Sequence, residues 1–206
     1  MIAIVDYGVG NLRSVQKALE SLGQQAAVTS DRTVLDAADG VILPGVGAFG
    51  DAMASLRRLG LEGALKENAK SGKPLLGICL GMQLLFSVSE EHGQHVGLGL
   101  IPGHVRRLHG DFKIPHVGWN SLRLVRRSPL TTGLDGGEMA YFVHSYYVEP
   151  MDGGVLVATT DYFRDLPAIV SRDNVHGMQF HPEKSAAAGL HLLGNFAALC
   201  APGVRV

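Results

Sequence analysis

Residues 74–83 have the sequence Pro-Leu-Leu-Gly-Ile-Cys-Leu-Gly-Met-Gln, and this stretch decides the fold. The apolar run at 75–78 is typical of a buried parallel strand, and residues 81–86 predict a helix directly after it. Cys79 lies at the junction, with a glycine two residues away on each side. This Gly-x-Cys-x-Gly pattern is the thiol form of the nucleophile elbow, a strained strand-to-helix turn. We therefore expect Cys79 to be a nucleophile, activated by the helix N-terminus.

The alternative for Cys79 is a small buried hydrophobe, which is the commonest role of a cysteine in an apolar run. A cysteine that is only buried needs no glycine on either side. Cys200 offers a comparison inside the same chain, because it follows Phe-Ala-Ala-Leu without a flanking glycine. We expect Cys200 to pack in the core and Cys79 to react.

Length and composition limit the possible classes of protein. The chain has 206 residues, enough for one α/β domain with a substantial core. A formal net charge of −1 argues against a nucleic-acid or acidic-membrane binder. With only two cysteines, the composition suits a reducing cytosol. The N-terminus lacks the basic segment of a signal peptide. No apolar run approaches the roughly 20 residues of a membrane helix. We expect a cytoplasmic protein.

The order of apolar segments predicts a mostly parallel, doubly wound sheet flanked by helices, with antiparallel edge strands. In the first half, strands at 2–5, 26–29 and 41–43 alternate with helices, the first capped by Asn11 and closed by Gly23. A further helix is expected around 53–59 and a loop at 97–103. The second half predicts shorter, partly alternating strands, and the chain ends in a helix. These segments are 104–108, 117–125, 141–148, 155–159 and 168–170 for the strands, and 186–199 for the helix.

A glycine-rich loop follows the third predicted strand, with the sequence Pro-Gly-Val-Gly-Ala-Phe-Gly-Asp at 44–51. Acyl chemistry at a cysteine builds negative charge on a carbonyl oxygen, which two backbone N–H groups can stabilise. The predicted donors are Leu80, directly after the nucleophile, and a residue of this loop, Gly45 or Val46.

The remaining catalytic candidates are in Gly-Met-Gln-Phe-His-Pro-Glu-Lys-Ser at 177–185. In an extended segment the side chains of His181 and Glu183 point to the same face. A carboxylate beside an imidazole fixes its tautomer and stabilises its charged form, as a base acting on a thiol requires. We predict a Cys79, His181 and Glu183 triad.

Two cofactor interpretations are weak. Gly8-Val9-Gly10 resembles the start of a dinucleotide motif, but Arg13 occupies the position of the third glycine. His92 and His95 have H-x-x-H spacing, but a glycine between them breaks any helix that would place both rings on one face. We expect no cofactor and no metal.

The stretches at 77–83 and 179–183 resemble the paired signatures of class I glutamine amidotransferases. Four further stretches, at 6–12, 44–47, 115–120 and 141–147, resemble the branch formed by the glutaminase subunits of imidazole glycerol phosphate synthases. The likeness extends from residue 2 to about 199. It implies a single glutamine amidotransferase type 1 domain over residues 1–206.

The resemblance implies a mechanism and a set of substrate contacts. Cys79 attacks the side-chain amide carbon of glutamine, His181 transfers the thiol proton to the leaving ammonia, and Glu183 orients His181. Water then hydrolyses the γ-glutamyl thioester to glutamate. The substrate-binding residues implied are the side chains of Gln83 and Glu91 and the backbone around Gly47, Ser145 and Tyr146.

The family also implies a partner, because its ammonia passes to a cyclase subunit of imidazole glycerol phosphate synthase. That subunit makes imidazole glycerol phosphate and an aminoimidazole-carboxamide ribonucleotide in histidine biosynthesis. It is a β/α barrel, which typically needs about 250 residues, so a heterodimer is expected. Trp119, Asn120 and Tyr141 are the candidate partner face; the alternative for Trp119 is a buried core aromatic.

Two other functions stay open at this point. One keeps the triad but changes the acceptor, either a glutaminase for another synthase or a free-standing γ-glutamyl hydrolase. The other is a catalytically silent assembly subunit, which the intact Cys79, His181 and Glu183 argue against.

Overall fold

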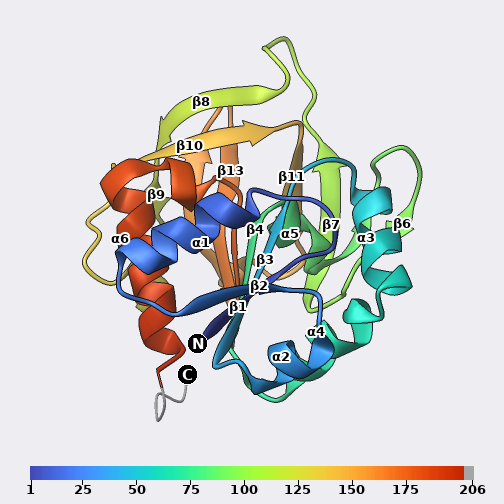
Figure 1. The fold of residues 1–206 in the computed structure, drawn as a ribbon. Helices are drawn as coiled ribbons and strands as arrows, with labels where there is room; N and C mark the ends of the chain where they lie inside the picture. The colour runs from blue at the N-terminus through green and yellow to red at the C-terminus, as the bar shows by residue number, and fades with distance from the viewer. Residues whose placement is uncertain (202–206) are drawn as a thin grey trace.

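The computed structural model of the chain describes residues 1–201. Its main sheet has eight strands in the order β2-β1-β3-β4-β14-β13-β12-β9 (Figure 1). The first five strands are parallel to one another and the last three are antiparallel, so the predicted sheet and its antiparallel edge are confirmed. In sheet order the strands are β2 (Ala26–Thr29), β1 (Ile2–Val5), β3 (Gly40–Gly45), β4 (Leu75–Cys79), β14 (Val175–Met178), β13 (Asp165–Arg172), β12 (Leu156–Asp161) and β9 (Arg123–Leu124).

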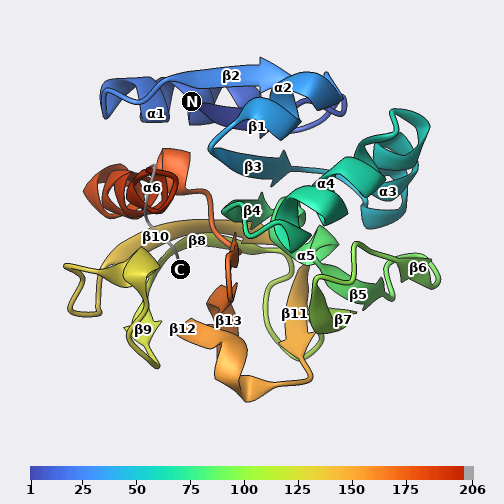
Figure 2. The ribbon, with the colours of Figure 1, turned by 90° about the horizontal axis from the view of Figure 1, so that it is seen from below.

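Helices cover both faces of the parallel part of this sheet (Figure 2). On one face, α1 (Leu12–Ser21) and α6 (Ala186–Leu199) bury Val15, Leu19 and Phe196 against the strands. The other face carries α2 (Arg32–Ala37), α3 (Phe49–Arg58) and α4 (Leu61–Lys70). Among residues 1–201, no helix is both long and apolar enough to cross a bilayer.

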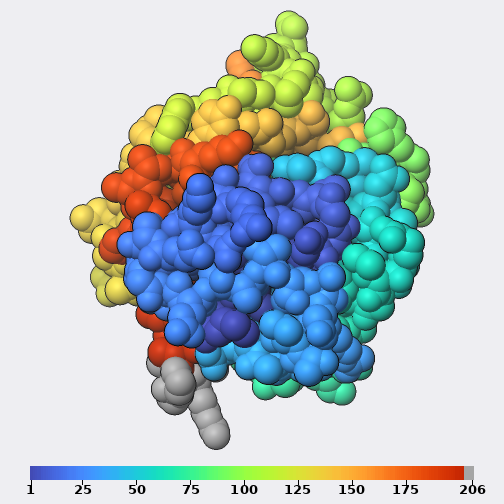
Figure 3. Space-filling model, viewed as in Figure 1, coloured from blue at the N-terminus to red at the C-terminus, as the bar shows by residue number. Residues whose placement is uncertain are grey.

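Two smaller sheets complete the fold. One pairs β10 (Met139–His144) with β8 (His116–Ser121), and Figure 1 shows both strands lying across one end of the molecule. The other has the order β11-β7-β5-β6, formed by β11 (Tyr146–Pro150), β7 (Ile101–Arg107), β5 (Phe86–Ser89) and β6 (His95–Val96). The segment between β7 and β8 projects from the same end of the molecule (Figure 3).

Several predicted boundaries are wrong. The helix after Cys79, α5 (Leu80–Leu84), is short, because Phe86 already pairs with Ile101 as the start of β5. The expected loop at 97–103 therefore ends at residue 100. The strand expected at 141–148 breaks at Ser145 into β10 and β11, which belong to different sheets. Likewise the strand expected at 117–125 divides into β8 and β9. Helix α4 was not predicted, and α3 begins at Phe49.

The predicted ends of helix α1 have different outcomes. Gly23 closes the helix as expected, with φ +74° and its N–H donated to the carbonyl of Glu20. Asn11 occupies the N-cap position, but its side chain makes no capping hydrogen bond. That prediction is wrong because the Asn11 amide points to Glu183, far away in sequence.

Candidate active site

The nucleophile elbow is present where the sequence predicts it. Cys79 ends β4 and precedes α5 with φ 55° and ψ −112°, a conformation that costs an L-residue strain energy. A Cβ on Gly81 would lie 1.7 Å from the carbonyl oxygen of Leu43, and one on Gly77 would lie 2.5 Å from the carbonyl oxygen of Gly81. Both glycines are therefore required by close backbone approach. The helix that follows has only five residues, which limits its dipole.

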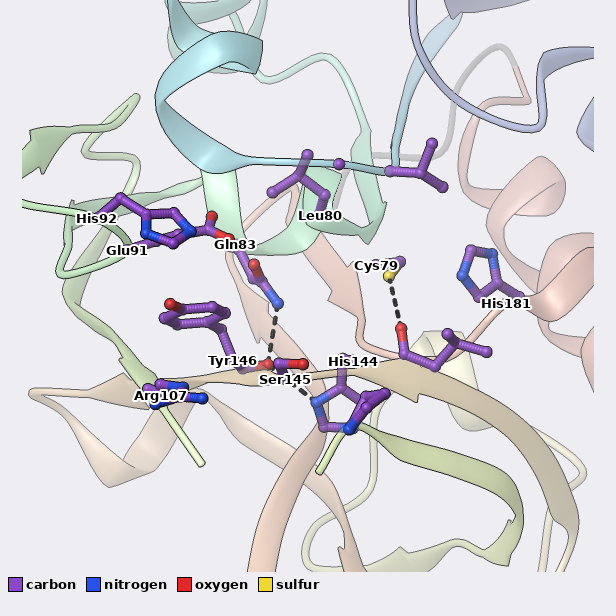
Figure 4. Close-up of a pocket in the computed structure, with 14 residues that line it drawn as sticks. Cys79, Leu80, Gln83, Glu91, His92, Arg107, His144, Ser145, Tyr146 and His181 are labelled. Atoms are coloured by element: carbon purple, nitrogen blue, oxygen red, sulfur yellow. Dashed lines mark hydrogen bonds between the residues drawn. The ribbon is translucent and has the colours of Figure 1, made fainter. Parts of the chain in front are cut away.

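A cavity of about 680 Å³ opens beside the sulfur of Cys79 (Figure 4). It brings together most of the residues predicted for the site, while Gly45 and Glu183 lie outside its lining. Gly45 is paired with Cys79 between β3 and β4, and a Cβ there would meet the Tyr7 hydroxyl at 2.5 Å. The predicted residues in the wall are Cys79, Leu80, Val46, Gly47, Gln83, Glu91, Ser145, Tyr146 and His181; those that the sequence did not indicate are His92, Arg107, Pro115, Val143 and His144.

His181 and Glu183 form the predicted pair, but by a different local geometry. The imidazole Nδ1 lies 2.9 Å from Oε1 of Glu183. The expected extended segment is wrong, because Glu183 belongs to a 3-10 turn, Pro182–Lys184. Asn11 donates to the same Oε1 at 3.1 Å. Burial alone would raise the pKa of Glu183, but its bonds with His181 and Asn11 lower it, so the group is a carboxylate.

The protonated form of His181 is stabilised beside the sulfur. Burial acts to lower the pKa of His181, but hydrogen bonding and charge interaction with Cys79 and Glu183 raise it to about 9. The thiol of Cys79 lies 3.8 Å from the carbonyl oxygen of Val143, to which it donates. The charge interactions behind this shift are those of an imidazolium between the sulfur and the Glu183 carboxylate, so His181 is suited to hold the proton that Cys79 gives up when it reacts.

A series of buried hydrogen bonds, which the sequence analysis did not predict, extends from the sulfur. Gln179 is fully buried and its Nε2 donates to the sulfur at 3.9 Å. Gln83 donates through Nε2 to Oε1 of Gln179 at 3.2 Å and to the carbonyl oxygen of Tyr146 at 3.0 Å. The same carbonyl accepts from Nδ1 of His144 at 2.9 Å, and Nε2 of His144 lies 3.1 Å from Nδ1 of His116. These bonds fix the amide of Gln83 so that its oxygen stays free.

Glu91 connects the cavity to the glycine-rich loop. Its Oε2 accepts a hydrogen bond from the backbone N–H of Phe49 at 2.6 Å. That N–H lies in the first turn of α3 and so has no acceptor within the helix. The N-cap residue, Ala48, has no side chain that could accept from it. Glu91 therefore caps α3 from a distance and holds the end of the loop at 44–48, with its other carboxylate oxygen left for a ligand.

The candidate partner residues lie on the sheet of β8 and β10. Trp119 is 48% exposed, so the buried alternative is wrong, and its ring centroid lies 5.8 Å from that of Tyr141 on the paired strand. Asn120 points inward instead, with Oδ1 2.9 Å from Nε2 of His116 and its Nδ2 donating to the carbonyl oxygen of Asp161 at 2.8 Å. Other apolar side chains exposed on these two strands are Val117, Met139 and Val143.

Two further predictions concern cysteine and metal. Cys200 packs in the core as expected, and burial raises the pKa of its thiol to about 12, which makes it unreactive. Within residues 1–201, no group of three or more His, Cys, Asp and Glu side chains is placed to hold a metal ion.

A cysteine on a nucleophile elbow, with a bonded imidazole and carboxylate beside it, defines the class of α/β proteins equipped for thiol chemistry on carbonyl carbons. The family model described as "Glutamine amidotransferase class-I" matches residues 3–199. The imidazole glycerol phosphate synthase subunit HisH of Moorella thermoacetica is 55% identical over 198 residues, covering 96% of this chain and 94% of that protein. The HisH subunit of Syntrophotalea carbinolica is 53% identical over 203 residues, covering 95% and 98%.

Solved structures agree at the level of the fold. A crystal structure of a glutamine amidotransferase superposes with a TM-score of 0.78 at 23% identity, covering 97% of this chain and 99% of that one. PurLQS from Thermotoga maritima gives 0.77 at 23% identity, covering 97% and 98%. The chain belongs to the class I glutamine amidotransferase family and, within it, to the HisH subunits of imidazole glycerol phosphate synthase.

Proposed function

We propose that the chain is a single-domain glutaminase that hydrolyses glutamine to glutamate and ammonia. His181 takes the thiol proton, and the sulfur of Cys79 forms a bond to the side-chain amide carbon. The tetrahedral intermediate collapses, the C–N bond breaks, and His181 returns the proton to the leaving nitrogen. Water, deprotonated by His181, then adds to the thioester carbon. The C–S bond breaks, glutamate is released, and His181 returns the proton to the sulfur of Cys79. Glu183 holds the imidazole in position throughout. The elbow geometry of Cys79 beside the His181–Glu183 pair supports this proposal.

Stabilisation of the oxyanion is assigned to backbone N–H groups on both sides of the sulfur. Leu80 is the first residue of α5, directly after the nucleophile. Val46 lines the cavity, and Gly45 is level with Cys79 on the neighbouring strand. Removing one donor of such a pair typically costs about 10²- to 10³-fold in turnover.

Glutamine would occupy the cavity with its amide at the sulfur and its amino-acid group at the other end. The free amide oxygen of Gln83 and the free carboxylate oxygen of Glu91 face this ligand, the latter suited to its ammonium group. Gly47, Ser145 and Tyr146 contribute backbone to the wall.

The ammonia would pass to a separate cyclase subunit in a cytoplasmic heterodimer. The relatives are named as subunits of imidazole glycerol phosphate synthase, which supports a separate partner subunit. The apolar face of Trp119 and Tyr141 supports a docking role for β8 and β10, with Asn120 behind it.

The decisive experiment is an assay with the purified cyclase subunit, comparing product formed from glutamine with product formed from added ammonia. We expect both for the wild type, and only ammonia-dependent product for Cys79→Ala. If Cys79→Ala still uses glutamine, the triad assignment is wrong. If glutamine is hydrolysed but no product forms, the chain serves another synthase or acts alone.

A further inference from the structure

Arg107 is a cation in the cavity wall that the proposed mechanism leaves without a role. It is the last residue of β7 and is paired with Tyr146 on β11. Among the described residues that line the cavity, Arg107 is the only Lys or Arg. The residue needs an explanation, because an arginine brought to a ligand cavity offers a planar set of donors that matches a carboxylate.

Its neighbour in sequence has a different environment. Arg106 forms ion pairs with Glu90 and Glu149, which neutralise its charge on the outside of the sheet. In contrast, none of the ion pairs found among residues 1–201 involves Arg107. The alternation of side chains along β7 thus directs one arginine to protein carboxylates and the other to the cavity.

The cavity has two chemically distinct ends. Figure 4 shows Cys79 and His181 at one end and Glu91, His92 and Arg107 grouped at the other, with Tyr146 near them. The permanent charges of the wall, one carboxylate and one guanidinium, are both at the end away from the sulfur. Free glutamine has the matching pattern, with an amide at one end and an ammonium and a carboxylate at the other.

We propose that Arg107 binds the α-carboxylate of glutamine and selects the free amino acid over forms whose α-carboxyl is blocked. This inference rests on the proposed glutaminase function and adds a specificity-determining residue to it. Glu91 would take the ammonium group, so that the two charges of the substrate meet two opposite charges of the wall. Because Arg107 is exposed at the cavity edge, solvent reduces the strength of the contact.

The test compares L-glutamine with L-glutamine α-amide, in which a neutral carboxamide replaces the α-carboxylate. For Arg107→Gln, bound to the cyclase subunit, we expect KM for glutamine to rise about tenfold with kcat nearly unchanged, since the contact is equally strong in ground and transition states. The preference for glutamine over its α-amide should fall by the same factor. Arg107→Lys should keep part of this preference for glutamine. Arg106→Gln is the matched control and should keep the full preference.

A second measurement does not depend on turnover or on a partner. The diazoketone analogue of glutamine, 6-diazo-5-oxo-L-norleucine, alkylates a nucleophilic cysteine while presenting the same α-groups, whereas iodoacetamide lacks them. In Arg107→Gln we expect alkylation of Cys79 by the diazoketone to slow about tenfold at subsaturating reagent, with no change for iodoacetamide.

The outcomes separate the two proposals. If wild-type Cys79 shows no faster reaction with the diazoketone than Cys200 does, the glutaminase proposal itself fails. If the wild type reacts selectively but Arg107→Gln matches it in KM, in α-amide preference and in alkylation, the role of Arg107 is refuted alone. Thermal unfolding of each variant checks that the fold is intact, as expected for an exposed side chain.

Discussion

The strained backbone of Cys79 leads us to predict an unusual effect of substitution on the free energy of unfolding, one that side-chain contacts alone would not indicate. At φ 55° and ψ −112°, the residue is held by pairing with Gly45 on one side and by α5 on the other. Two variants remove the thiol, Cys79→Ala and Cys79→Gly, and they differ by a single Cβ. At an ordinary position the glycine variant is less stable by about 0.5–1 kcal/mol, because glycine loses more backbone entropy on folding.

At residue 79 the strain changes this balance. Replacing alanine by glycine here relieves about 1–3 kcal/mol of backbone strain. Against this, the glycine variant loses about 0.5–1 kcal/mol of backbone entropy and about 0.8 kcal/mol of hydrophobic burial for one carbon, since Cys79 is only 7% exposed. The net difference lies between about 0.8 kcal/mol in favour of Cys79→Ala and about 1.7 kcal/mol in favour of Cys79→Gly, and without strain it would be about 1.3–1.8 kcal/mol in favour of Cys79→Ala. For a chain of this length, each kcal/mol corresponds to about 2–4 °C in Tm.

Urea unfolding of both variants at pH 7 measures this difference directly. Ala198→Gly on the exposed side of α6 is the matched control, where the glycine should cost about 0.5–1 kcal/mol. If Cys79→Gly is less stable than Cys79→Ala by the amount seen in the control plus about 0.8 kcal/mol for the buried carbon, the backbone at residue 79 stores no strain and the elbow argument is refuted.

Three further predictions follow from buried contacts. Asn11→Ala should lower kcat about tenfold with little change in KM, because Glu183 loses one of the donors that lower its pKa and position it; steady-state kinetics measures both constants. Gly81→Ala should lose more than about 4 kcal/mol in urea unfolding, since a Cβ would overlap the carbonyl of Leu43. Burial lowers the pKa of His176 to about 4, so between pH 6.5 and 4 the unfolded state binds more protons than the folded state, and the free energy of unfolding decreases as the pH is lowered. His176→Gln should reduce the slope of the unfolding free energy against pH by up to about 1.4 kcal/mol per pH unit, measured by urea unfolding at pH 7, 6 and 5.

The parallel sheet and the elbow were predictable because their signals are short in sequence. A buried parallel strand is recognised as an apolar run. Gly77 is required by a backbone contact within the turn, and Gly81 by a backbone contact with the neighbouring strand β3. The breaks at Ser145 and before Phe86 were not predictable. Aromatic and β-branched residues, which favour strands, stand on both sides of residue 145, and an apolar residue such as Phe86 fits a helix and a strand equally well.

Contacts between distant segments were also beyond the sequence. Asn11 and Glu183 are 172 residues apart, and the local pattern around Asn11 fits an N-cap equally well. Gln179 stands two positions before His181, but its bond to Gln83 spans 96 residues. In the pair of adjacent arginines at 106 and 107, only strand register determines which one reaches the cavity.

The buried hydrogen bonds also have a definite proton count. His144 donates from Nδ1 to the Tyr146 carbonyl, which has no proton to offer, so a neutral His144 accepts at Nε2 from Nδ1 of His116. Neutral His116 then has no proton at Nε2 for Oδ1 of Asn120, whose amide nitrogen is committed to a carbonyl. Burial lowers the pKa of His116, which disfavours the charged ring that would satisfy both contacts. The contact between His116 and Asn120 is therefore the weakest in this series of hydrogen bonds. It lies at the end of the series away from Cys79, on β8, the strand whose exposed side is proposed to meet the cyclase.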